Sequence, residues 1–271
     1  MTSAWLPTAP CSPRTCVETT PAAARAVPRA VLRLTGVALL LLAGAALSPL
    51  AARLPEAAVR RWCRWIVRAA GVRVRITGGP APAGGLLLVA NHISWLDVPL
   101  LAAVRPARML AKTEVRHWPL AGALAARGGT LFIDRDRLRA LPDTVARIAG
   151  ALREGAAIAA FPEGSTWCGR AQGPFRRAVF QAALDAGVPV QPVRIAYRLG
   201  PATACTAPAF VGDDTLIASV WRVLTSRGLV AEVEVRPAIP PGGVPDRRAL
   251  ARAAQQHPGP APAGTHAVLV A

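Results

Sequence analysis

The sequence is poor in aromatic residues and almost free of lysine. Aromatic side chains make up 5% of the 271 residues, and Tyr197 is the single tyrosine. Proteins that bind single-stranded nucleic acid stack bases on such rings, so this scarcity argues against that class. Lys112 is the single lysine, which leaves 31 arginines among the 32 basic residues. A GC-rich coding sequence is one explanation of this bias.

Acidic residues are also scarce, with 15 carboxylates against 32 basic side chains and a net charge of +17. The pI near 11.6 means that the surface attracts anions such as nucleic acid, acidic lipid headgroups or phosphorylated substrates. A non-enzymatic basic protein that binds a membrane surface or duplex nucleic acid would carry the same charge. Charge alone therefore leaves the partner open.

No pair of cysteines has the C-x-x-C spacing. The cysteines are Cys11, Cys16, Cys63, Cys168 and Cys205. An odd number without paired spacing indicates neither a disulfide framework nor a zinc site, and it fits a reducing compartment. The sequence therefore predicts no metal ion and no redox cofactor.

An apolar run without charge extends over 19 residues, 34–52, and is just long enough to cross a bilayer. The small residues Ala43-Gly44-Ala45 resemble a signal-peptide cleavage site, but more than 30 residues precede the run. We expect a retained membrane anchor, with a cleaved or buried segment as the alternatives. Four arginines precede the run and seven follow within 25 residues. This bias predicts a domain on the cytoplasmic side of the cell membrane, although a helix lying in one leaflet stays open.

A basic amphipathic helix is predicted directly after the run. The apolar positions at helical spacing are Ala58, Val59, Trp62, Trp65, Ile66 and Ala69. Arg61, Arg64 and Arg68 share the opposite side, which is typical of a helix at a membrane surface. An ordinary core-packing helix with a solvated charged face is the alternative.

Composition divides the chain into four parts. Residues 1–28 contain five prolines and no periodicity, so we expect a disordered leader, followed by the anchor and amphipathic helix at 29–70. The tail at 237–271 is rich in Pro, Ala and Gly and is also expected to be disordered. The folded domain is therefore expected at 71–236.

Within this domain, short apolar runs alternate with helical stretches. The predicted strands are 72–76, 86–90, 108–111, 130–133, 156–161, 188–197 and 229–235. The clearest helical stripe is Leu138, Leu141, Val145, Ile148 and Leu152. This alternation predicts a single α/β domain with a largely parallel sheet flanked by helices.

Polar residues with catalytic chemistry follow the predicted strands. His92 lies on the turn after the strand 86–90, at the edge where α/β sheets bind ligands, and Asp97 follows in the next helix. A carboxylate behind an imidazole fixes its tautomer and stabilises the imidazolium, as a general base requires. A capping box formed by Ser94 and Asp97 is the structural alternative. Glu163 and Arg135 follow two further strands, and an arginine there suits a phosphate.

These segments resemble the motifs of the glycerolipid acyltransferases, and the bacterial 1-acyl-sn-glycerol-3-phosphate acyltransferases in particular. The matching segments, in order, are Asn91-His92 with Asp97, Phe132-Ile133-Asp134-Arg135, Phe161-Pro162-Glu163-Gly164 and Val188-Pro189-Val190. The resemblance covers about residues 70–200. It implies an acyltransferase domain, and the anchor predicted from the apolar run precedes this domain.

The resemblance also implies roles for individual residues. His92 would remove the proton from a lysolipid hydroxyl, and Asp97 would orient His92. Substrate binding would fall to Arg135, Glu163, Gly164, Lys112 and Pro189. Acyl-CoA or acyl carrier protein would supply the acyl chain as a thioester, with no cofactor, no metal and no nucleic acid involved.

One departure concerns the acceptor. The family commonly has an arginine two positions after the glycine of Phe-Pro-Glu-Gly, and here Thr166 stands in that place. Lysophosphatidate is the first expectation for the acceptor, because phosphatidic acid synthesis is the activity that the resemblance implies. A lyso-ornithine lipid, which has a hydroxyl and no phosphate, is the alternative.

Overall fold

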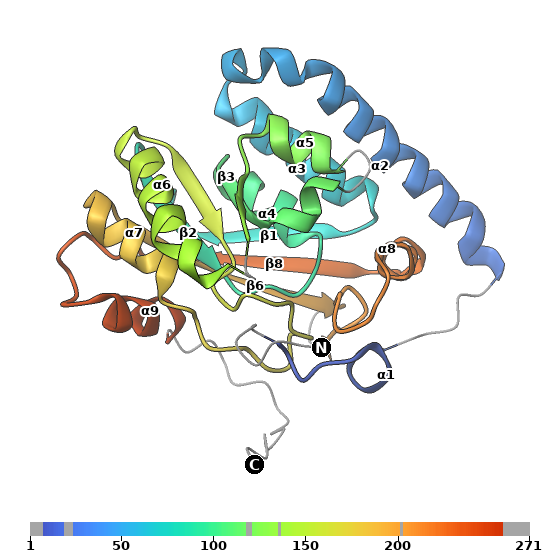
Figure 1. Cartoon of the computed structure of the whole chain (residues 1–271). Helices are drawn as coiled ribbons and strands as arrows, with labels where there is room; N and C mark the ends of the chain where they lie inside the picture. Colours follow the sequence, from blue (N-terminus) through green and yellow to red (C-terminus); the bar gives the residue numbers. More distant parts are fainter. Residues whose placement is uncertain (1–7, 19–23, 118–120, 135–136, 201–202, 257–271) are drawn as a thin grey trace.

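A mostly parallel β-sheet runs through the centre of the molecule (Figure 1). The computed structural model describes residues 8–18, 24–117, 121–134, 137–200 and 203–256. The strands are β1 (Arg73–Gly78), β2 (Leu86–Ala90), β3 (Arg108–Lys112), β4 (Leu131–Ile133), β5 (Ala157–Ala160), β6 (Val190–Leu199), β7 (Thr203–Ala204) and β8 (Leu229–Val235). Their order in the sheet is β1-β8-β6-β2-β5-β3-β4, with β7 beside β6. Among the pairs of named strands in the described residues, only those of β6 with β7 and β8 are antiparallel, which confirms the predicted sheet type.

The central strands are apolar on both faces because both faces are covered. In β2, Leu86, Leu88 and Ala90 belong to one core, whereas Leu87 and Val89 belong to the other. Alternate residues of a strand point to opposite faces, so a strand buried on both sides becomes a continuous apolar run. For this reason the predicted bounds of β2 agree with the structure to the residue. The predicted bounds of β8 agree as well, although Glu234 on its other face is exposed.

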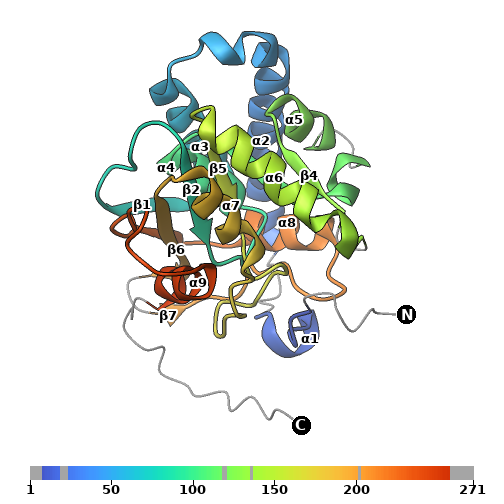
Figure 2. The ribbon, with the colours of Figure 1, turned by 60° about the vertical axis from the view of Figure 1, so that its left-hand side comes forward.

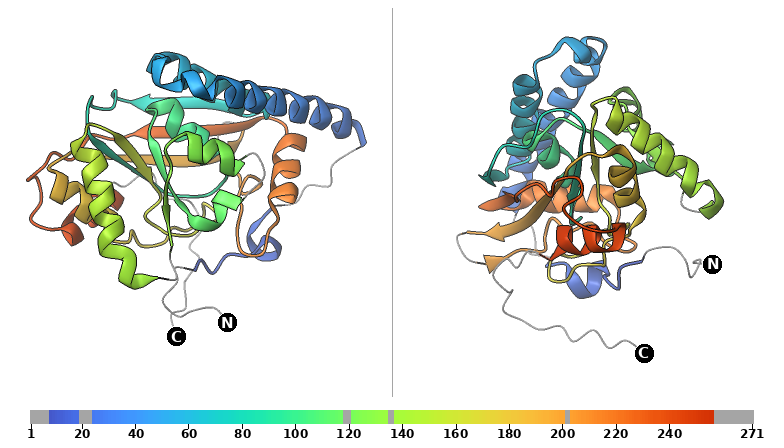
Figure 3. Two further views of the ribbon diagram at one scale, coloured as in Figure 1. Left: turned by 45° about the horizontal axis from the view of Figure 1, so that its top comes forward. Right: turned by 90° about the vertical axis from the view of Figure 1, so that its left-hand side faces the viewer.

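Helices form a layer on each face of the sheet (Figures 2 and 3). The helices are α1 (Pro13–Cys16), α2 (Val27–Leu47), α3 (Glu56–Ala69), α4 (Asp97–Val104), α5 (Ala121–Arg127), α6 (Leu141–Arg153), α7 (Ala178–Ala186), α8 (Leu216–Thr225) and α9 (Arg247–Gln255). Buried side chains of α3, α4 and α8 contribute to one core. Those of α6, α7 and α9 contribute to the other.

The predicted apolar run lies in α2 and the 3-10 helix Ser48–Arg53 that follows it. Residues Val27–Leu50 are long and apolar enough to cross a membrane by length and composition, with a mean hydropathy of 2.1. Helix α2 packs against α3 and α8 at the rim of the molecule (Figure 1). At Gly44 the helices α2 and α3 approach so closely that a Cβ atom would overlap the ring of Trp62.

Helix α3 forms as predicted, but its buried stripe is turned from the predicted one. Cys63, Ile66 and Val67 are buried, while Trp65 is 50% exposed beside exposed arginines. The physical reason is that α3 packs against α4 as well as α2, so two neighbours select its buried side. The helix therefore packs into the core, as the alternative states, and also presents a basic surface with an exposed tryptophan.

The prediction of a disordered leader is wrong for residues 8–18. Cys11 and Val17 are buried against the domain, and the backbone N–H of Glu18 donates to Thr206 Oγ1 at 3.0 Å. Local composition does not show such contacts because they join segments nearly 190 residues apart. Residues 1–7 and 19–23 lie outside the described residues.

The prediction of a disordered tail is also wrong in its first half. Ile239 pairs with Val190, and Asp246 caps α9 by accepting two backbone N–H bonds of 2.7 Å. Leu250, Ala251 and Ala254 of α9 are buried in one of the two cores. The folded unit thus extends to about residue 256, and residues 257–271 lie outside the described residues.

Candidate active site

Two neighbouring parallel strands place the candidate catalytic residues at one edge of the sheet. Strand β2 ends at Ala90 and β5 ends at Ala160, and these strands pair in parallel. His92 follows the first strand and Glu163 follows the second. Carboxyl ends of parallel strands are where open α/β sheets bind their ligands.

His92 and Asp97 form a hydrogen-bonded pair. The imidazole Nδ1 lies 2.9 Å from Asp97 Oδ2. The Asp97 side chain is fully buried, whereas the His92 side chain is 22% exposed. Because the carboxylate accepts at Nδ1, the other ring nitrogen, Nε2, keeps its lone pair and can act as a base. The geometry predicted from the strand-turn-helix pattern is confirmed.

Asp97 accepts three further hydrogen bonds. The backbone N–H groups of Ile93 and Ser94 donate to Oδ2 at 2.6 and 2.8 Å. Tyr197 Oη donates to Oδ1 at 2.6 Å. The bond from Ser94 is the backbone half of the predicted capping box, so Asp97 both caps the turn and orients His92.

Sequence reasoning missed the roles of Tyr197 and Asn91. Tyr197 lies on β6, is 3% exposed, and burial raises the pKa of its hydroxyl well above the usual value. Asn91 exchanges two hydrogen bonds of 2.8 and 2.9 Å with the backbone of Ile195. These contacts attach the turn that contains His92 to strand β6. Each joins residues about 100 positions apart, so spacing alone gives no signal for them.

Glu163 supports the histidine turn from the neighbouring strand. It is 2% exposed, and its two oxygens accept from the backbone N–H groups of His92 at 2.7 Å and Gly173 at 3.1 Å. Burial raises the pKa of Glu163 to about 8, although both hydrogen bonds act to lower it. Both oxygens of this predicted substrate-binding carboxylate therefore accept hydrogen bonds from the backbone, which suits a structural role.

The loop after β5 encloses His92 from a second side. The Phe161 ring stacks on the imidazole, with centroids 3.9 Å apart and planes 8° apart. The backbone N–H of Trp167 donates to the carbonyl of His92 at 2.8 Å. Between them Gly164 has a φ of 76°, a left-handed conformation that favours glycine. The imidazole plane is therefore fixed by stacking as well as by hydrogen bonds.

Three of the other four predicted substrate-binding residues end or follow strands at this edge of the sheet in the sequence. Lys112 is exposed at the end of β3, which runs parallel to β5, so it lies at the same sheet edge as His92. Arg135 follows β4 in the sequence and lies outside the described residues. Gly164 is part of the loop beside His92.

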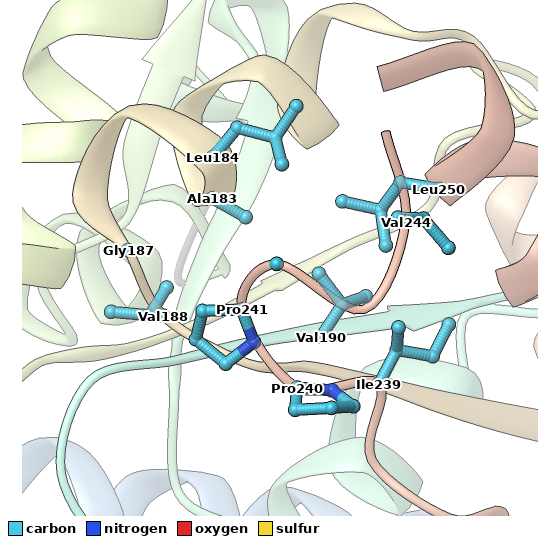
Figure 4. Close-up of a pocket in the computed structure, with 11 residues that line it drawn as sticks. Ala183, Leu184, Gly187, Val188, Val190, Ile239, Pro240, Pro241, Val244 and Leu250 are labelled. Atoms are coloured by element: carbon cyan, nitrogen blue, oxygen red, sulfur yellow. The ribbon is translucent and has the colours of Figure 1, made fainter. Parts of the chain in front are cut away.

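Pro189 does not come to this edge, which corrects its predicted place. Its carbonyl accepts from the N–H of Leu87, near the start of β2, so it lies at the opposite end of the sheet from His92. The flanking residues Val188 and Val190 line an apolar cavity of about 140 Å³ (Figure 4). The resemblance assigns this motif to the substrate site, whereas the parallel register with β2 places its residues at the amino end of β6.

Neither serine near the motifs is set up as a nucleophile. Ser94 is fully buried, and its Oγ accepts from the backbone N–H of Leu96. Ser165 Oγ is buried without a hydrogen-bond partner in the part of the chain that the structure describes. A serine nucleophile requires a base within hydrogen-bond reach, and among the described residues neither serine is hydrogen-bonded to one.

A histidine oriented by a buried carboxylate, next to a Phe-Pro-Glu-Gly loop at the edge of an α/β sheet, defines an acyltransferase site. The family model for the acyltransferase domain matches residues 73–196. The chain is 42% identical to the lyso-ornithine lipid O-acyltransferase of Pseudomonas aeruginosa over 217 residues, which are 79% of this chain and 80% of that one. It is 36% identical to the 1-acyl-sn-glycerol-3-phosphate acyltransferase of Neisseria gonorrhoeae over 161 residues, 58% of this chain and 62% of that one.

A solved structure shares the fold. The crystal structure of the 1-acyl-sn-glycerophosphate acyltransferase PlsC from Thermotoga maritima superposes with a TM-score of 0.59 at 18% identity, over 86% of this chain and 92% of that one. The chain belongs to the acyltransferase family of the lyso-ornithine lipid and 1-acyl-sn-glycerol-3-phosphate acyltransferases. This confirms the resemblance and the enzyme class predicted from the motifs.

Proposed function

We propose that this acyltransferase moves an acyl chain from an acyl thioester to the hydroxyl of a lysolipid, with His92 as the general base. The observation that carries the proposal is the 2.9 Å bond from His92 Nδ1 to the buried Asp97, which leaves Nε2 available at a partly exposed ring. His92 Nε2 would take the proton of the acceptor hydroxyl as its oxygen attacks the thioester carbonyl. The carbon–sulfur bond then breaks, and the departing thiolate takes the proton from the imidazolium.

For the acceptor we propose a lyso-ornithine lipid rather than lysophosphatidate. Thr166 stands where a phosphate-binding arginine is common in the family, which supports an acceptor without phosphate. The relatives named lyso-ornithine lipid O-acyltransferase add support, since the Pseudomonas enzyme matches at higher identity and coverage than the Neisseria enzyme. Lysophosphatidate remains the competing acceptor, favoured by the basic surface and by Lys112 at the active-site edge.

The acceptor is tested by assaying both lysolipids with acyl-CoA and with acyl carrier protein thioesters, following release of the free thiol. We expect turnover to be faster with the lyso-ornithine lipid. Thr166→Arg should raise the ratio of lysophosphatidate to lyso-ornithine turnover by about tenfold, the effect of a single added phosphate contact of about 1.4 kcal/mol. Thr166→Gln is the matched control, because it adds length without charge. Faster turnover of lysophosphatidate by the natural protein would reject the proposed acceptor.

We further propose that α2 anchors the enzyme in one leaflet of the cell membrane, with the domain on the cytoplasmic side. Arg29 donates to the carbonyl of Thr225 at 2.9 Å, and Arg33 donates to the carbonyls of Leu224 and Ser226 at 2.7 Å. These bonds tie the first turns of α2 to the end of α8, so the helix lies along the domain. Leu32, Leu39 and Leu42 are exposed on it and are free to enter lipid.

Membrane binding is tested by sedimentation with vesicles. Leu32→Glu combined with Leu39→Glu should move the protein from the pellet to the supernatant, because two charges would have to enter the apolar region of the bilayer. Leu199→Glu, an exposed leucine at the end of β6, is the matched control and should leave sedimentation unchanged. Unaltered pelleting of the double variant would contradict the proposed anchor.

A further inference from the structure

Three cysteines from two distant segments meet beside the active-site loop. Cys11 precedes the short helix α1 and Cys16 is its last residue. Cys168 lies five residues after Glu163 in the loop that follows β5. Their three sulfur atoms all lie within 4.8 Å of one another. Cys11 and Cys168 are buried and Cys16 is partly buried. All three thiols are free.

The spacing of these sulfur atoms suits a thiophilic metal ion. Zinc binds thiolates at about 2.3 Å in a tetrahedral arrangement, which separates neighbouring sulfur atoms by roughly 3.8 Å. The three sulfur atoms here are at most about 1 Å farther apart than that separation. Three thiolates with an open fourth position form a known type of soft-metal ligand set.

We propose that Cys11, Cys16 and Cys168 bind one thiophilic divalent ion of the zinc class, with the fourth position taken by water or another small ligand. On binding, the thiols release their protons to solvent and three metal–sulfur bonds replace three metal–water bonds. The step involves no oxidation or reduction. The proposal differs from the sequence-based expectation of no metal site, because Cys168 is 152 positions from Cys16 and C-x-x-C spacing gives no signal for such a pair.

The proposed metal would fasten the amino-terminal segment to the loop that holds the catalytic histidine. The backbone N–H of Trp167, next to Cys168, donates to the carbonyl of His92 at 2.8 Å. On the other side of the same loop, Gly173 donates to Glu163. An ion pair between Arg170 and Glu18 already joins the same two segments. A bound ion would therefore stabilise the loop without entering the reaction.

Cobalt provides a direct test, because thiolate-to-cobalt charge transfer gives an absorbance that free Co²⁺ lacks. The full chain, reduced with a phosphine, freed of metal by chelation and handled without oxygen, is titrated with Co²⁺. We expect the charge-transfer band to saturate at one equivalent and to decrease when Zn²⁺ is added. The thermal unfolding midpoint should rise with Co²⁺ or Zn²⁺.

Matched variants make the assignment specific. Cys168→Ser and Cys11→Ser should each lose most of the charge-transfer band and the metal-dependent rise in the midpoint. Cys63→Ser should keep both, since Cys63 is also buried but lies on α3, outside the cluster. Absence of the band in the natural protein, with all five thiols shown to be reduced, would overturn the proposal. Equal loss of the band in Cys63→Ser would overturn it too, because the signal would then not come from the cluster.

Discussion

Tyr197 donates a hydrogen bond of 2.6 Å to Asp97 Oδ1, while the other oxygen of Asp97 accepts from His92 at 2.9 Å. The single tyrosine of the chain thus stands behind the carboxylate that orients the candidate base. Both Asp97 and Tyr197 are buried, so this contact acts in a medium where hydrogen bonds to a charged group are strong.

Removal of the Tyr197 hydroxyl should change the behaviour of His92. In Tyr197→Phe the Asp97 carboxylate loses a donor and pulls more strongly on the imidazole proton. The acidic limb of the rate profile for thiol release should therefore move to higher pH. Stability should fall by about 1–3 kcal/mol, because a buried acceptor loses its partner.

Thr144→Val is the control for this variant. The buried Thr144 hydroxyl of α6 donates to the carbonyl of Ala140, which lies just before the helix. Its loss should lower stability and leave the pH profile in place. If Tyr197→Phe merely destabilises the fold with an unshifted profile, Tyr197 has no positioning role.

Glu163 should make stability depend on pH between about 4.5 and 8. Its pKa is raised from 4.5 to about 8 in the folded chain, so folding favours the neutral carboxyl. The stabilisation from this group is complete below the unfolded pKa and is lost as pH rises through the folded pKa. Thermal midpoints measured across this range should fall with rising pH, and Glu163→Gln should remove most of that slope.

Glu154→Gln, an exposed glutamate at the end of α6, should keep the slope of the natural protein. A slope that is the same in Glu163→Gln as in the natural protein would show that other groups produce it.

Gly44 and Gly36 of α2 should respond differently to the same substitution. A Cβ atom on Gly44 would overlap the Trp62 ring, whereas one on Gly36 would lie at an ordinary 3.6 Å from Cβ of Ala69. Gly44→Ala should therefore lower the free energy of unfolding by about 1–3 kcal/mol through overpacking. Gly36→Ala should be neutral or slightly stabilising, because alanine favours the helix. Equal effects would mean that α2 and α3 do not pack as described.

Much of the fold follows from the sequence because the central strands are buried on both faces. The run at Leu86–Ala90 is buried on both faces and is too short for a helix. The run at Leu229–Val235 instead buries alternate residues in one core, and the predicted bounds of both runs agree with the structure. The contact between His92 and Asp97 could also be predicted from the sequence, because both residues lie within one strand-turn-helix unit.

The contacts that sequence reasoning missed all join distant segments. Tyr197 reaches Asp97 from β6, Glu163 uses its oxygens on backbone donors, and α9 packs in a region of low-complexity composition. Local pattern describes one element at a time and cannot show which elements become neighbours. Pro189 shows the same limit, because a motif match does not tell at which end of the sheet a residue lies.

The central claim is that His92 is the general base, and thiol release by His92→Ala tests it most directly. His117→Ala, which removes an exposed histidine from the 3-10 helix Thr113–His117, is the matched control. The fold should survive in both variants, because Asp97 keeps its bonds from Ile93, Ser94 and Tyr197. We predict that His92→Ala lowers kcat/KM by roughly 10²–10⁴-fold, whereas His117→Ala keeps the turnover of the natural protein. Natural turnover in a folded His92→Ala variant would contradict the account.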